Sequence, residues 1–272
     1  MISVVNLGMI DYATALRLQR SLVAMRKDNR IGDTLLLLEH TPVITLGRNA
    51  KEKNIVAPRD FLESKGVELF ETDRGGDVTF HGPGQLVAYP IFDLRALTPK
   101  LGAVEYVRKL EELLIRTCAH FQIPTQRIFG LTGVWTIARE GHGFSRADDA
   151  SAQHEALAPE APAKIAAIGV HISRAVTSHG FALNVSTDLD YFKLIVPCGI
   201  ADKPVTSIEH ETGRQVVMDN VIPVVTRSFG EVFNQQILWL ESLDDLLPTP
   251  EDTPARSPSD LRSIHGDDTT LA

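Results

Sequence analysis

Apolar residues recur at helical spacing in three stretches of the chain. In the first, residues 11–27, Asp11 stands directly before the apolar positions as a candidate N-cap. Residues 103–121 and 221–240 show the same spacing. The pattern therefore predicts three helices.

Shorter apolar or alternating segments between these stretches predict strands. They are residues 34–39, 43–46, 86–92, 134–138, 165–172, 181–185 and 215–218. Residues 77–80, at one flank of a glycine-rich loop, also read as strand. Strands and helices do not alternate regularly, so the expected fold class is α+β, or mixed α/β, rather than a doubly wound sheet.

Two of the expected strands, residues 165–172 and 181–185, are close enough in sequence to form a hairpin. A tight turn at Arg174 and Ala175 would pair residues whose numbers sum to 349, so Gly169 would face Gly180. Two opposed glycines would leave a slot in the sheet, into which a ligand or another backbone could approach closely.

Two segments are polar, acidic and poor in large apolar residues. Residues 241–272 hold two Arg against eight Asp or Glu, and residues 139–163 hold two Arg against five acids, so the remainder carries a net charge of +1. A segment of this composition buries too little apolar surface to offset the conformational entropy that it would lose on folding. We expect one domain over residues 1–247, a flexible insertion at 141–163 and a disordered acidic tail at 248–272.

Composition excludes several classes of protein. The net charge of -8 is unfavourable for nucleic-acid binding, and no run approaches the roughly 18 apolar residues of a membrane span. The first residues lack the pattern of a signal peptide. With two cysteines, Cys118 and Cys198, a disulfide framework is not expected, and the cytoplasm is the expected compartment.

The two cysteines lie in different surroundings. Cys118 continues the apolar spacing of residues 103–121 and is predicted to be a small buried residue. Cys198 lies between Pro197 and Gly199, where it is either a presented nucleophile or a plain turn cysteine. A thiol that acts near neutral pH needs a nearby cation or base, for which His81, His179 and Lys164 are candidates. A lysine at a strand start is otherwise simply solvated.

Glycines crowd the stretch RGGDVTFHGPGQLVAY, residues 74–89. It lacks the Lys-Ser/Thr ending of a nucleotide-binding P-loop. Its bare backbone at Gly75, Gly76, Gly82 and Gly84 would instead let an elongated ligand approach closely. No histidine and cysteine cluster has the spacing of a metal site.

The same stretch resembles the signature of the lipoyl(octanoyl) transferases, and the resemblance covers residues 3–240. Four further blocks follow in the order of that family: GVW from Gly133, KIAAIG from Lys164, SHGFALNV from Ser178 and VPCGI from Val196. The chain departs from the family at Thr132, where proline is usual, and in its insertion and tail. The insertion enters directly before Lys164 and so bears on how Lys164 is positioned.

The resemblance implies a fold like the catalytic module of biotin and lipoate protein ligases, a mixed sheet flanked by helices. It also implies a catalytic pair in which Cys198 carries an octanoyl thioester and Lys164 lowers the pKa of its thiol. The acyl-binding residues that it implies are Arg74, Gly75, Gly76, Asp77, Val78, Thr79, Phe80, His81, Ala167, Ile168, Gly169, Gly180, Phe181 and Ala182.

The implied reaction moves an octanoyl or lipoyl group from acyl carrier protein to a lysine of a lipoyl domain. The implied acceptors are the E2 subunits of 2-oxoacid dehydrogenases and the glycine cleavage H protein, with no nucleic acid or membrane as partner. No cofactor or metal is expected, since the donor acyl group arrives on phosphopantetheine. The alternatives are an ATP-dependent lipoate protein ligase and a non-catalytic module that binds lipoyl domains or acyl carriers.

A basic segment precedes the glycine-rich stretch. A stretch of twelve residues contains four basic ones, Arg48, Lys51, Lys53 and Arg59. The chain outside its two acidic segments is otherwise close to neutral. Acyl carrier protein and many lipoyl domains are acidic, so this segment is a candidate docking surface; the alternative is an ordinary solvated charge run.

Overall fold

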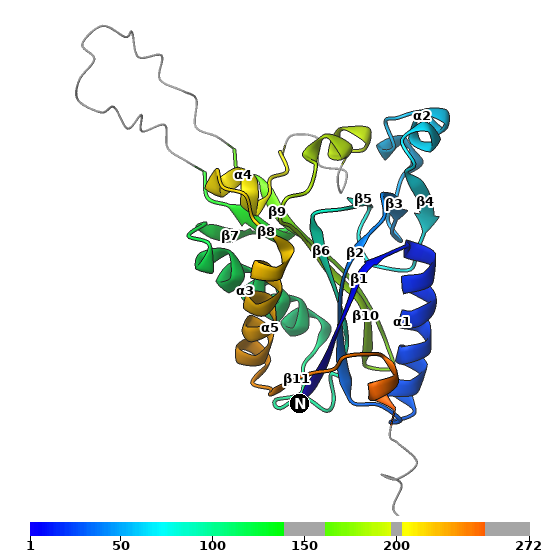
Figure 1. The fold of residues 1–272 in the computed structure, drawn as a ribbon, viewed down its shortest axis with the longest axis vertical. Helices are drawn as coiled ribbons and strands as arrows, with labels where there is room; N and C mark the ends of the chain where they lie inside the picture. The colour runs from blue at the N-terminus through cyan, green and yellow to red at the C-terminus, as the bar shows by residue number, and fades with distance from the viewer. Residues whose placement is uncertain (139–160, 197–202, 248–272) are drawn as a thin grey trace, which may run out of the picture.

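The computed structural model describes residues 1–138, 161–196 and 203–247 (Figure 1). Most of the chain builds an eight-stranded mixed sheet in the order β11-β1-β2-β6-β10-β9-β8-β7, and a three-stranded sheet, β4-β3-β5, stands beside it. The expected mixed sheet flanked by helices is confirmed. None of the described helices is both long and apolar enough to span a membrane.

The strands of the large sheet combine parallel and antiparallel pairs. β1 pairs in parallel with both β11 and β2, and the remaining neighbours are antiparallel. Their bounds are β1 Ile2–Ile10, β2 Asp33–His40, β6 Gln85–Ile91, β7 Thr125–Ile128, β8 Leu131–Thr136, β9 Lys164–Ser173, β10 Val176–Asn184 and β11 Ile237–Trp239. The small sheet holds β3 Val43–Leu46, β4 Glu68–Glu71 and β5 Val78–His81.

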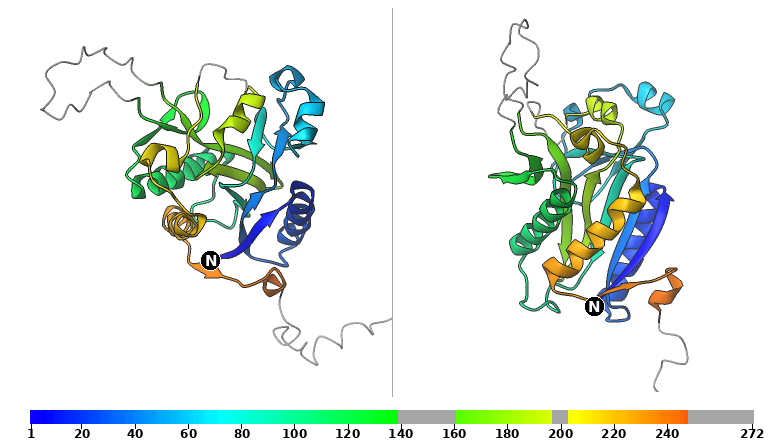
Figure 2. Two further views of the ribbon diagram at one scale, coloured as in Figure 1. Left: turned by 45° about the horizontal axis from the view of Figure 1, so that its top comes forward. Right: turned by 60° about the vertical axis from the view of Figure 1, so that its left-hand side comes forward.

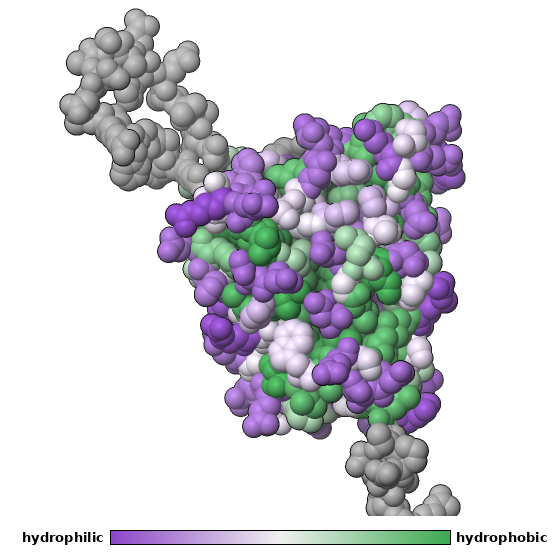
Figure 3. Space-filling view, in the orientation of Figure 1, coloured by the Kyte–Doolittle hydropathy of each residue, from purple (hydrophilic) through white to green (hydrophobic). Residues whose placement is uncertain are grey.

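Helices cover both faces of the large sheet (Figure 2). α1 (Tyr12–Lys27) packs on one face, while α3 (Ala103–His120) and α5 (Met218–Phe233) pack on the other. Short helices α2 (Arg59–Ser64) and α4 (Ile208–Thr212) lie in connections, as do 3-10 turns at Glu52–Asn54, Leu189–Leu194 and Asp244–Leu246. On the face drawn in Figure 3, hydrophobic side chains gather over the middle and hydrophilic ones towards the rim.

Two of the three helix predictions are confirmed closely. Asp11 caps α1, where its Oδ1 accepts a hydrogen bond of 2.8 Å from the Thr14 N–H. α3 buries the apolar positions that predicted it. The third predicted helix ends early, because Asn234 adopts a left-handed conformation (φ 52°) and the chain continues as β11.

The strand predicted at residues 215–218 is wrong. Val217 is extended but pairs with no strand, and α5 begins at Met218. Three strands of the large sheet, β1, β7 and β11, were not predicted, nor was β4 of the small sheet. The last residue of the predicted insertion, Ala163, is buried, and its N–H donates to Thr136 Oγ1 at 3.0 Å. The rest of that insertion from 141 to 160, and the predicted tail, lie outside the described residues.

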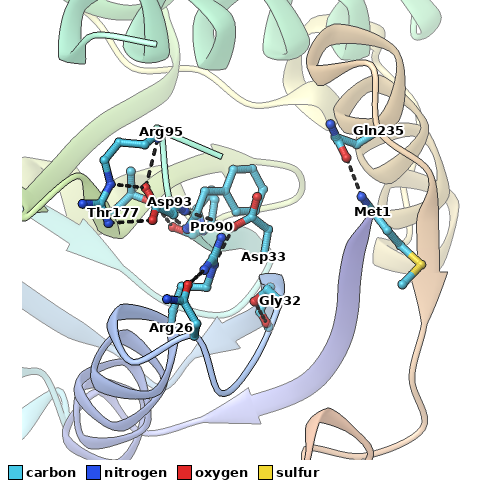
Figure 4. Close-up of polar contacts among 12 residues, drawn as sticks. Met1, Arg26, Gly32, Asp33, Pro90, Asp93, Arg95, Thr177 and Gln235 are labelled. Atoms are coloured by element: carbon cyan, nitrogen blue, oxygen red, sulfur yellow. Dashed lines mark hydrogen bonds and ion pairs between the residues drawn. The ribbon is translucent and has the colours of Figure 1, made fainter. Parts of the chain in front are cut away.

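Ion pairs and hydrogen bonds fasten one end of the large sheet (Figure 4). Arg26 at the end of α1 donates to Asp33 Oδ1 at 2.8 Å, and the same oxygen accepts from the Asp93 N–H at 3.0 Å. Thr177 Oγ1 donates to the Pro90 carbonyl at 2.7 Å. α1, β2, β6 and β10 are thereby joined at this end.

The predicted hairpin register is confirmed. β9 and β10 pair with residue numbers summing to 349, and Gly169 faces Gly180. Arg174 and Ala175 both adopt positive φ (52° and 66°), the geometry of a type I′ turn that neither residue favours. The pairing and burial of the ladder override this local preference.

Neighbouring backbone occupies part of the predicted glycine slot. A Cβ at Gly180 would overlap the Ala88 carbonyl oxygen on β6 and would lie 2.6 Å from Pro90 Cδ. A Cβ at Gly169 would lie 2.8 Å from the Gly75 carbonyl oxygen. These glycines therefore let a neighbouring backbone approach closely. The sequence left open whether a ligand or another backbone would do so.

We expect Gly180→Ala to lower the free energy of unfolding by about 2 kcal/mol, because the added methyl forces β6 and β10 apart. Urea denaturation of the purified variant measures this change. Gly32→Ala is the matched control, since a Cβ there meets no atom within 4 Å. Equal stability of the two variants would contradict the close approach of β6 to Gly180.

A buried histidine gives stability a pH dependence. His40 contacts the Ile10 carbonyl oxygen through Nδ1 at 3.0 Å and the Tyr89 hydroxyl through Nε2 at 2.7 Å. Burial lowers the pKa of His40 from 6.5 to about 4. Between these values the unfolded chain binds more protons than the folded one, so stability decreases as the pH falls.

We therefore expect the melting temperature to drop between pH 7 and pH 5, and His40→Gln to reduce that drop, because glutamine does not titrate. His120→Gln, on the exposed end of α3, should leave the slope unchanged. Thermal denaturation over a pH series measures both. A slope in the His40 variant as steep as that of the parent chain would refute this account.

Candidate functional site

A cavity lies on the face of the large sheet that α1 covers, between this sheet and the small one. Strands β9, β10 and β6 supply its floor, and β5 and the loop before it close it from above. Its lining consists of Tyr12, Arg74, Gly75, Gly76, Asp77, Thr79, His81, Val87, Tyr89, Ala167, Ile168, Gly169, His179, Gly180, Phe181 and Ala182.

Residues 74–77, here called the cover loop, are tied to both sheets. The Gly75 N–H donates to the Val170 carbonyl on β9 at 3.0 Å. The Arg74 guanidinium donates to the Thr45 carbonyl and to the Asp77 carbonyl, both at 2.7 Å. Arg74 is buried, and the hydrogen bonds described here hold the loop in place.

Strand alternation divides the predicted acyl-binding residues of β5 into two groups. Thr79 and His81 line the cavity. Val78 and Phe80 point the other way, into a small core between β3, α2 and the turn Leu189–Leu194. Phe80 stacks on Tyr191 there, with ring centroids 4.6 Å apart. The structure therefore places Val78 and Phe80 outside the cavity lining, because successive side chains on a strand face opposite sides.

The hairpin supplies the remaining predicted residues. Ala167, Ile168 and Gly169 on β9 line the cavity opposite Gly180, Phe181 and Ala182 on β10, in register. The alanines and glycines among them leave room above the sheet, whereas the Phe181 ring stacks on Phe229 of α5 on the other face, with ring centroids 6.0 Å apart. All the predicted acyl-binding residues except Val78 and Phe80 thus line one cavity.

Polar aromatic residues that the sequence did not single out also face this cavity. Tyr12 begins α1, Tyr89 lies on β6, and both are buried. Their rings pack beside the histidines, with Tyr12 and His81 stacked at 6.4 Å. Tyr89 was visible as the last residue of the signature, but its direction depends on the register of β6.

His179 is a lining residue in an unusual conformation. Its φ is 54°, and its N–H donates to Gln19 Oε1 on α1 at 2.8 Å. Its Nε2 lies 2.8 Å from Asp73 Oδ1, next to the cover loop. Burial lowers the pKa of His179, although Asp73 opposes this effect. The ring is therefore neutral near pH 7 and donates to the carboxylate of Asp73.

Lys164, the predicted partner of the nucleophile, begins β9 and is buried. Its N–H donates to the Pro204 carbonyl at 2.8 Å, and its carbonyl accepts from the Thr206 N–H at 3.0 Å. Its Nζ lies over the Trp135 ring, 4.7 Å from the centroid, a cation-π contact.

Gly133 explains why the block GVW begins with glycine. Its φ is 124°, and a Cβ there would lie 2.7 Å from the Ala166 carbonyl oxygen and 3.5 Å from Lys164 Cε. The block therefore gives Lys164 both the space for its side chain and, at Trp135, an aromatic surface against which it packs.

Of the two cysteines, Cys118 alone lies among the described residues, and its predicted burial is confirmed. Cys118 is fully buried, and burial raises the pKa of its thiol to about 12, so it is unsuited to be a nucleophile. Cys198 lies outside the described residues. The described chain before it binds Asn54 through the Val196 N–H at 2.7 Å, and the chain after it reaches Lys164 at Pro204.

Among the described residues, no group of three or more His, Cys, Asp and Glu could hold a metal ion. The four basic residues Arg48, Lys51, Lys53 and Arg59 are exposed beside the cover loop. The Lys51 N–H donates to Asp77 Oδ1 at 3.2 Å, which joins this segment to the loop.

Solved structures share the fold at low sequence identity. An archaeal bipartite lipoate protein ligase from Thermoplasma acidophilum superposes with a TM-score of 0.63 at 16% identity, covering 89% of this chain and 87% of that one. A lipoate-protein ligase A bound with ATP gives a TM-score of 0.60 at 16% identity, covering 89% of each chain.

Sequence comparisons are closer. The family described as "Lipoyl protein ligase A/B catalytic domain" matches residues 11–230. An octanoyltransferase of Koribacter versatilis (strain Ellin345) is 64% identical over 271 residues, covering 100% of both chains. One from Acidobacterium capsulatum is 55% identical over 254 residues, covering 91% of this chain and 96% of that one.

Agreement of this extent, over a fold and a cavity that carry the expected motifs, shows that the chain belongs to the octanoyltransferases, acyltransferases of the lipoyl protein ligase A/B catalytic-domain family.

Proposed function

We propose that octanoyl transfer by this chain passes through a thioester on Cys198, with Lys164 as its partner. The position of Lys164 is the observation that carries the proposal. It begins the same strand whose residues 167–169 line the cavity, about 10 Å further on at roughly 3.3 Å per residue. An acyl chain in the cavity would thus point its carbonyl end towards Lys164.

The chemistry follows from the residue types. The Lys164 ammonium holds the Cys198 thiol as a thiolate, which attacks the carbonyl carbon of an octanoyl thioester on acyl carrier protein. The carbon-sulfur bond to the carrier breaks, and the carrier sulfur takes a proton from Lys164. A new thioester then joins the octanoyl group to Cys198.

The second half-reaction uses the neutral Lys164 left by the first. Lys164 takes a proton from the ε-ammonium of a lipoyl-domain lysine, and the resulting amine attacks the acyl-enzyme. The attacking nitrogen releases its remaining surplus proton to solvent as the amide forms, and Cys198 leaves as thiolate beside the Lys164 ammonium. Because an amide is more stable than a thioester, the transfer needs no ATP, cofactor or metal. The proposed acceptors are E2 lipoyl domains and the glycine cleavage H protein, in the cytoplasm.

An ATP-dependent ligase and a non-catalytic carrier-binding module are the competing functions. The shared fold does not separate a transferase from a ligase, whereas the octanoyltransferase relatives favour the transferase. Supplying ATP with free octanoate instead of octanoyl-carrier distinguishes these functions. Lipoyl-domain octanoylation from the carrier alone supports the transferase.

We expect Cys198→Ser to abolish transfer and Cys118→Ser to retain it, because Cys118 is buried within α3. Intact mass after incubation with octanoyl-carrier should show one octanoyl adduct in the Cys118 variant and none in the Cys198 variant.

Lys164→Ala should slow transfer by about 10²-fold and shift Cys198 alkylation to higher pH. An unchanged alkylation profile would remove Lys164 from this role.

The exposed basic segment is the docking surface that we propose for the acidic carrier. Arg48 donates its N–H to the Arg74 carbonyl at 3.0 Å, and Asn54 Nδ2 donates to Asp77 Oδ2 at 2.6 Å. These bonds hold the segment against the cover loop, so a carrier bound here would lie beside the cavity.

If docking is electrostatic, the second-order rate of acyl-enzyme formation should fall steeply with salt. Lys51→Glu with Lys53→Glu should reproduce that fall at low salt. Arg30→Glu with Lys100→Glu changes the same charge on exposed residues at the opposite end of the sheet, and should have little effect. Stopped-flow rates over a salt series would decide. A flat profile excludes the segment as a docking site.

A further inference from the structure

The chain that leads to Cys198 lies against the end of a 3-10 turn. An antiparallel bridge joins Ile195 to Ile55, the residue that follows this turn. Beside the bridge, the Val196 N–H donates to the carbonyl of Asn54, the last residue of the turn, at 2.7 Å. Val196 is the last described residue before Cys198, two positions earlier. Asn54 therefore helps to set the direction in which the chain approaches the nucleophile.

The side chain of Asn54 is fastened to the cover loop. Asn54 is 7% exposed, and its Nδ2 donates to Asp77 Oδ2 at 2.6 Å. A carboxylate oxygen can only accept, so the amide presents its nitrogen to Asp77. The other oxygen, Asp77 Oδ1, accepts from the Lys51 N–H at 3.2 Å and from the Val78 N–H at 2.8 Å. Three donors thus fix this carboxylate, and the carboxylate fixes the turn that ends at Asn54.

The residues of β5 that turn away from the cavity support the same chain. Val78 and Phe80 form a small core with Phe192 and Ile195, and all four are buried. The Phe80 ring meets the Phe192 ring edge-on, with centroids 5.7 Å apart. One face of β5 therefore lines the cavity, while the other packs against residues that precede Cys198 in the chain.

Asp77 connects this arrangement to the cavity. It lines the cavity, and its carbonyl accepts from the Arg74 guanidinium at 2.7 Å and from the Gly47 N–H at 3.2 Å. Through one side chain and one carbonyl, Asn54 thus joins the cavity wall to the chain before the nucleophile. Reactions between bound groups depend on alignment, and a displacement of roughly 1 Å can slow them by about 10²-fold.

We propose that Asn54 and Asp77 are positioning residues for acyl transfer. They hold the chain before Cys198 against the cavity wall and so align the nucleophile with the carbonyl end of a bound acyl chain. The proposal rests on the thioester function above and adds two residues to it. In this role neither residue exchanges a proton with the acyl group or bonds to it. A purely structural tie, in contrast, would contribute to stability alone.

The test exchanges the two side chains. Asn54→Asp alone places two carboxylates at hydrogen-bond distance, and we expect it to slow acyl-enzyme formation by about tenfold or more. Adding Asp77→Asn restores a donor and an acceptor, because the new amide donates to position 54 while its oxygen still accepts from the Lys51 and Val78 N–H groups. The double variant should return to within about threefold of the parent rate, the coupling expected of residues in contact.

The measured quantity is the rate at which the octanoyl adduct appears on the enzyme, followed by quenched-flow mass spectrometry well below the melting temperature of every variant. Octanoyl-pantetheine replaces octanoyl-carrier in a parallel series, because a negative charge at position 54, next to Lys53, would also weaken docking of an acidic carrier. A misaligned nucleophile slows transfer from both substrates, whereas a docking defect slows transfer from the carrier alone.

Asp33→Asn is the matched control for stability. Asp33 is a buried carboxylate whose Oδ1 accepts from Arg26 Nε at 2.8 Å and from the Asp93 N–H at 3.0 Å. The strand registers place it at the end of the large sheet opposite Lys164. Asp33→Asn should lower the melting temperature and keep the parent rate of acyl-enzyme formation. Asn54→Ala removes the tie without adding a charge, and gives a second measurement if Asn54→Asp fails to fold.

A parent-like rate in Asn54→Asp or Asn54→Ala overturns this inference, as does a loss that Asp77→Asn fails to repair or a loss seen with the carrier alone. A rate lowered equally in Asp33→Asn also overturns it, since stability would then account for the effect. Each of these results leaves the acyl-transfer function intact. A parent chain that forms no octanoyl adduct would instead overturn the thioester function itself.

Discussion

The contact between the cover loop and β9 is the one on which the site depends. The loop approaches the sheet so closely that the Gly75 carbonyl occupies the place of a side chain at Gly169. Arg74 holds the loop from the other side through Thr45 on β3. This backbone contact helps to join the large sheet to the small one, and the cavity lies between them.

Burial shapes the chemistry on both sides of this space. Lys164 is withdrawn from water yet packs on Trp135, an aromatic face that favours a cation. His81 and His179 line the same cavity, and burial lowers the pKa of each, so both rings remain neutral near pH 7. Desolvation therefore leaves these two rings as neutral hydrogen-bonding groups of the cavity.

Sequence reasoning predicted what is local or tightly periodic. The cap at Asp11, the buried Cys118 and the hairpin register all depend on short spacings, and each was confirmed. The resemblance supplied most of the cavity lining, but treated β5 as a continuous block and so included Val78 and Phe80. Their direction depends on the strand alternation.

Other features depend on distant segments and could not be predicted. Tyr12 and Tyr89 line the same cavity only after α1 packs against β6. The turn at Arg174 contradicts local preference because the pairing of β9 with β10 along its whole length determines it. The boundary between α5 and β11 likewise depends on the left-handed conformation of Asn234. The pairing of β11 with β1, far away in sequence, stabilises this conformation.

That pairing also determines when the sheet can be completed during synthesis. β11 lies beside β1 with Ile237 opposite Ile2, although almost the entire chain separates them. Until the ribosome has released this distant segment, one edge of β1 has no neighbour and is open to pairing with another nascent chain. A topology that joins the two extremes of the sequence in this way has a high contact order, and it makes assembly of this edge slow and dependent on protection from aggregation.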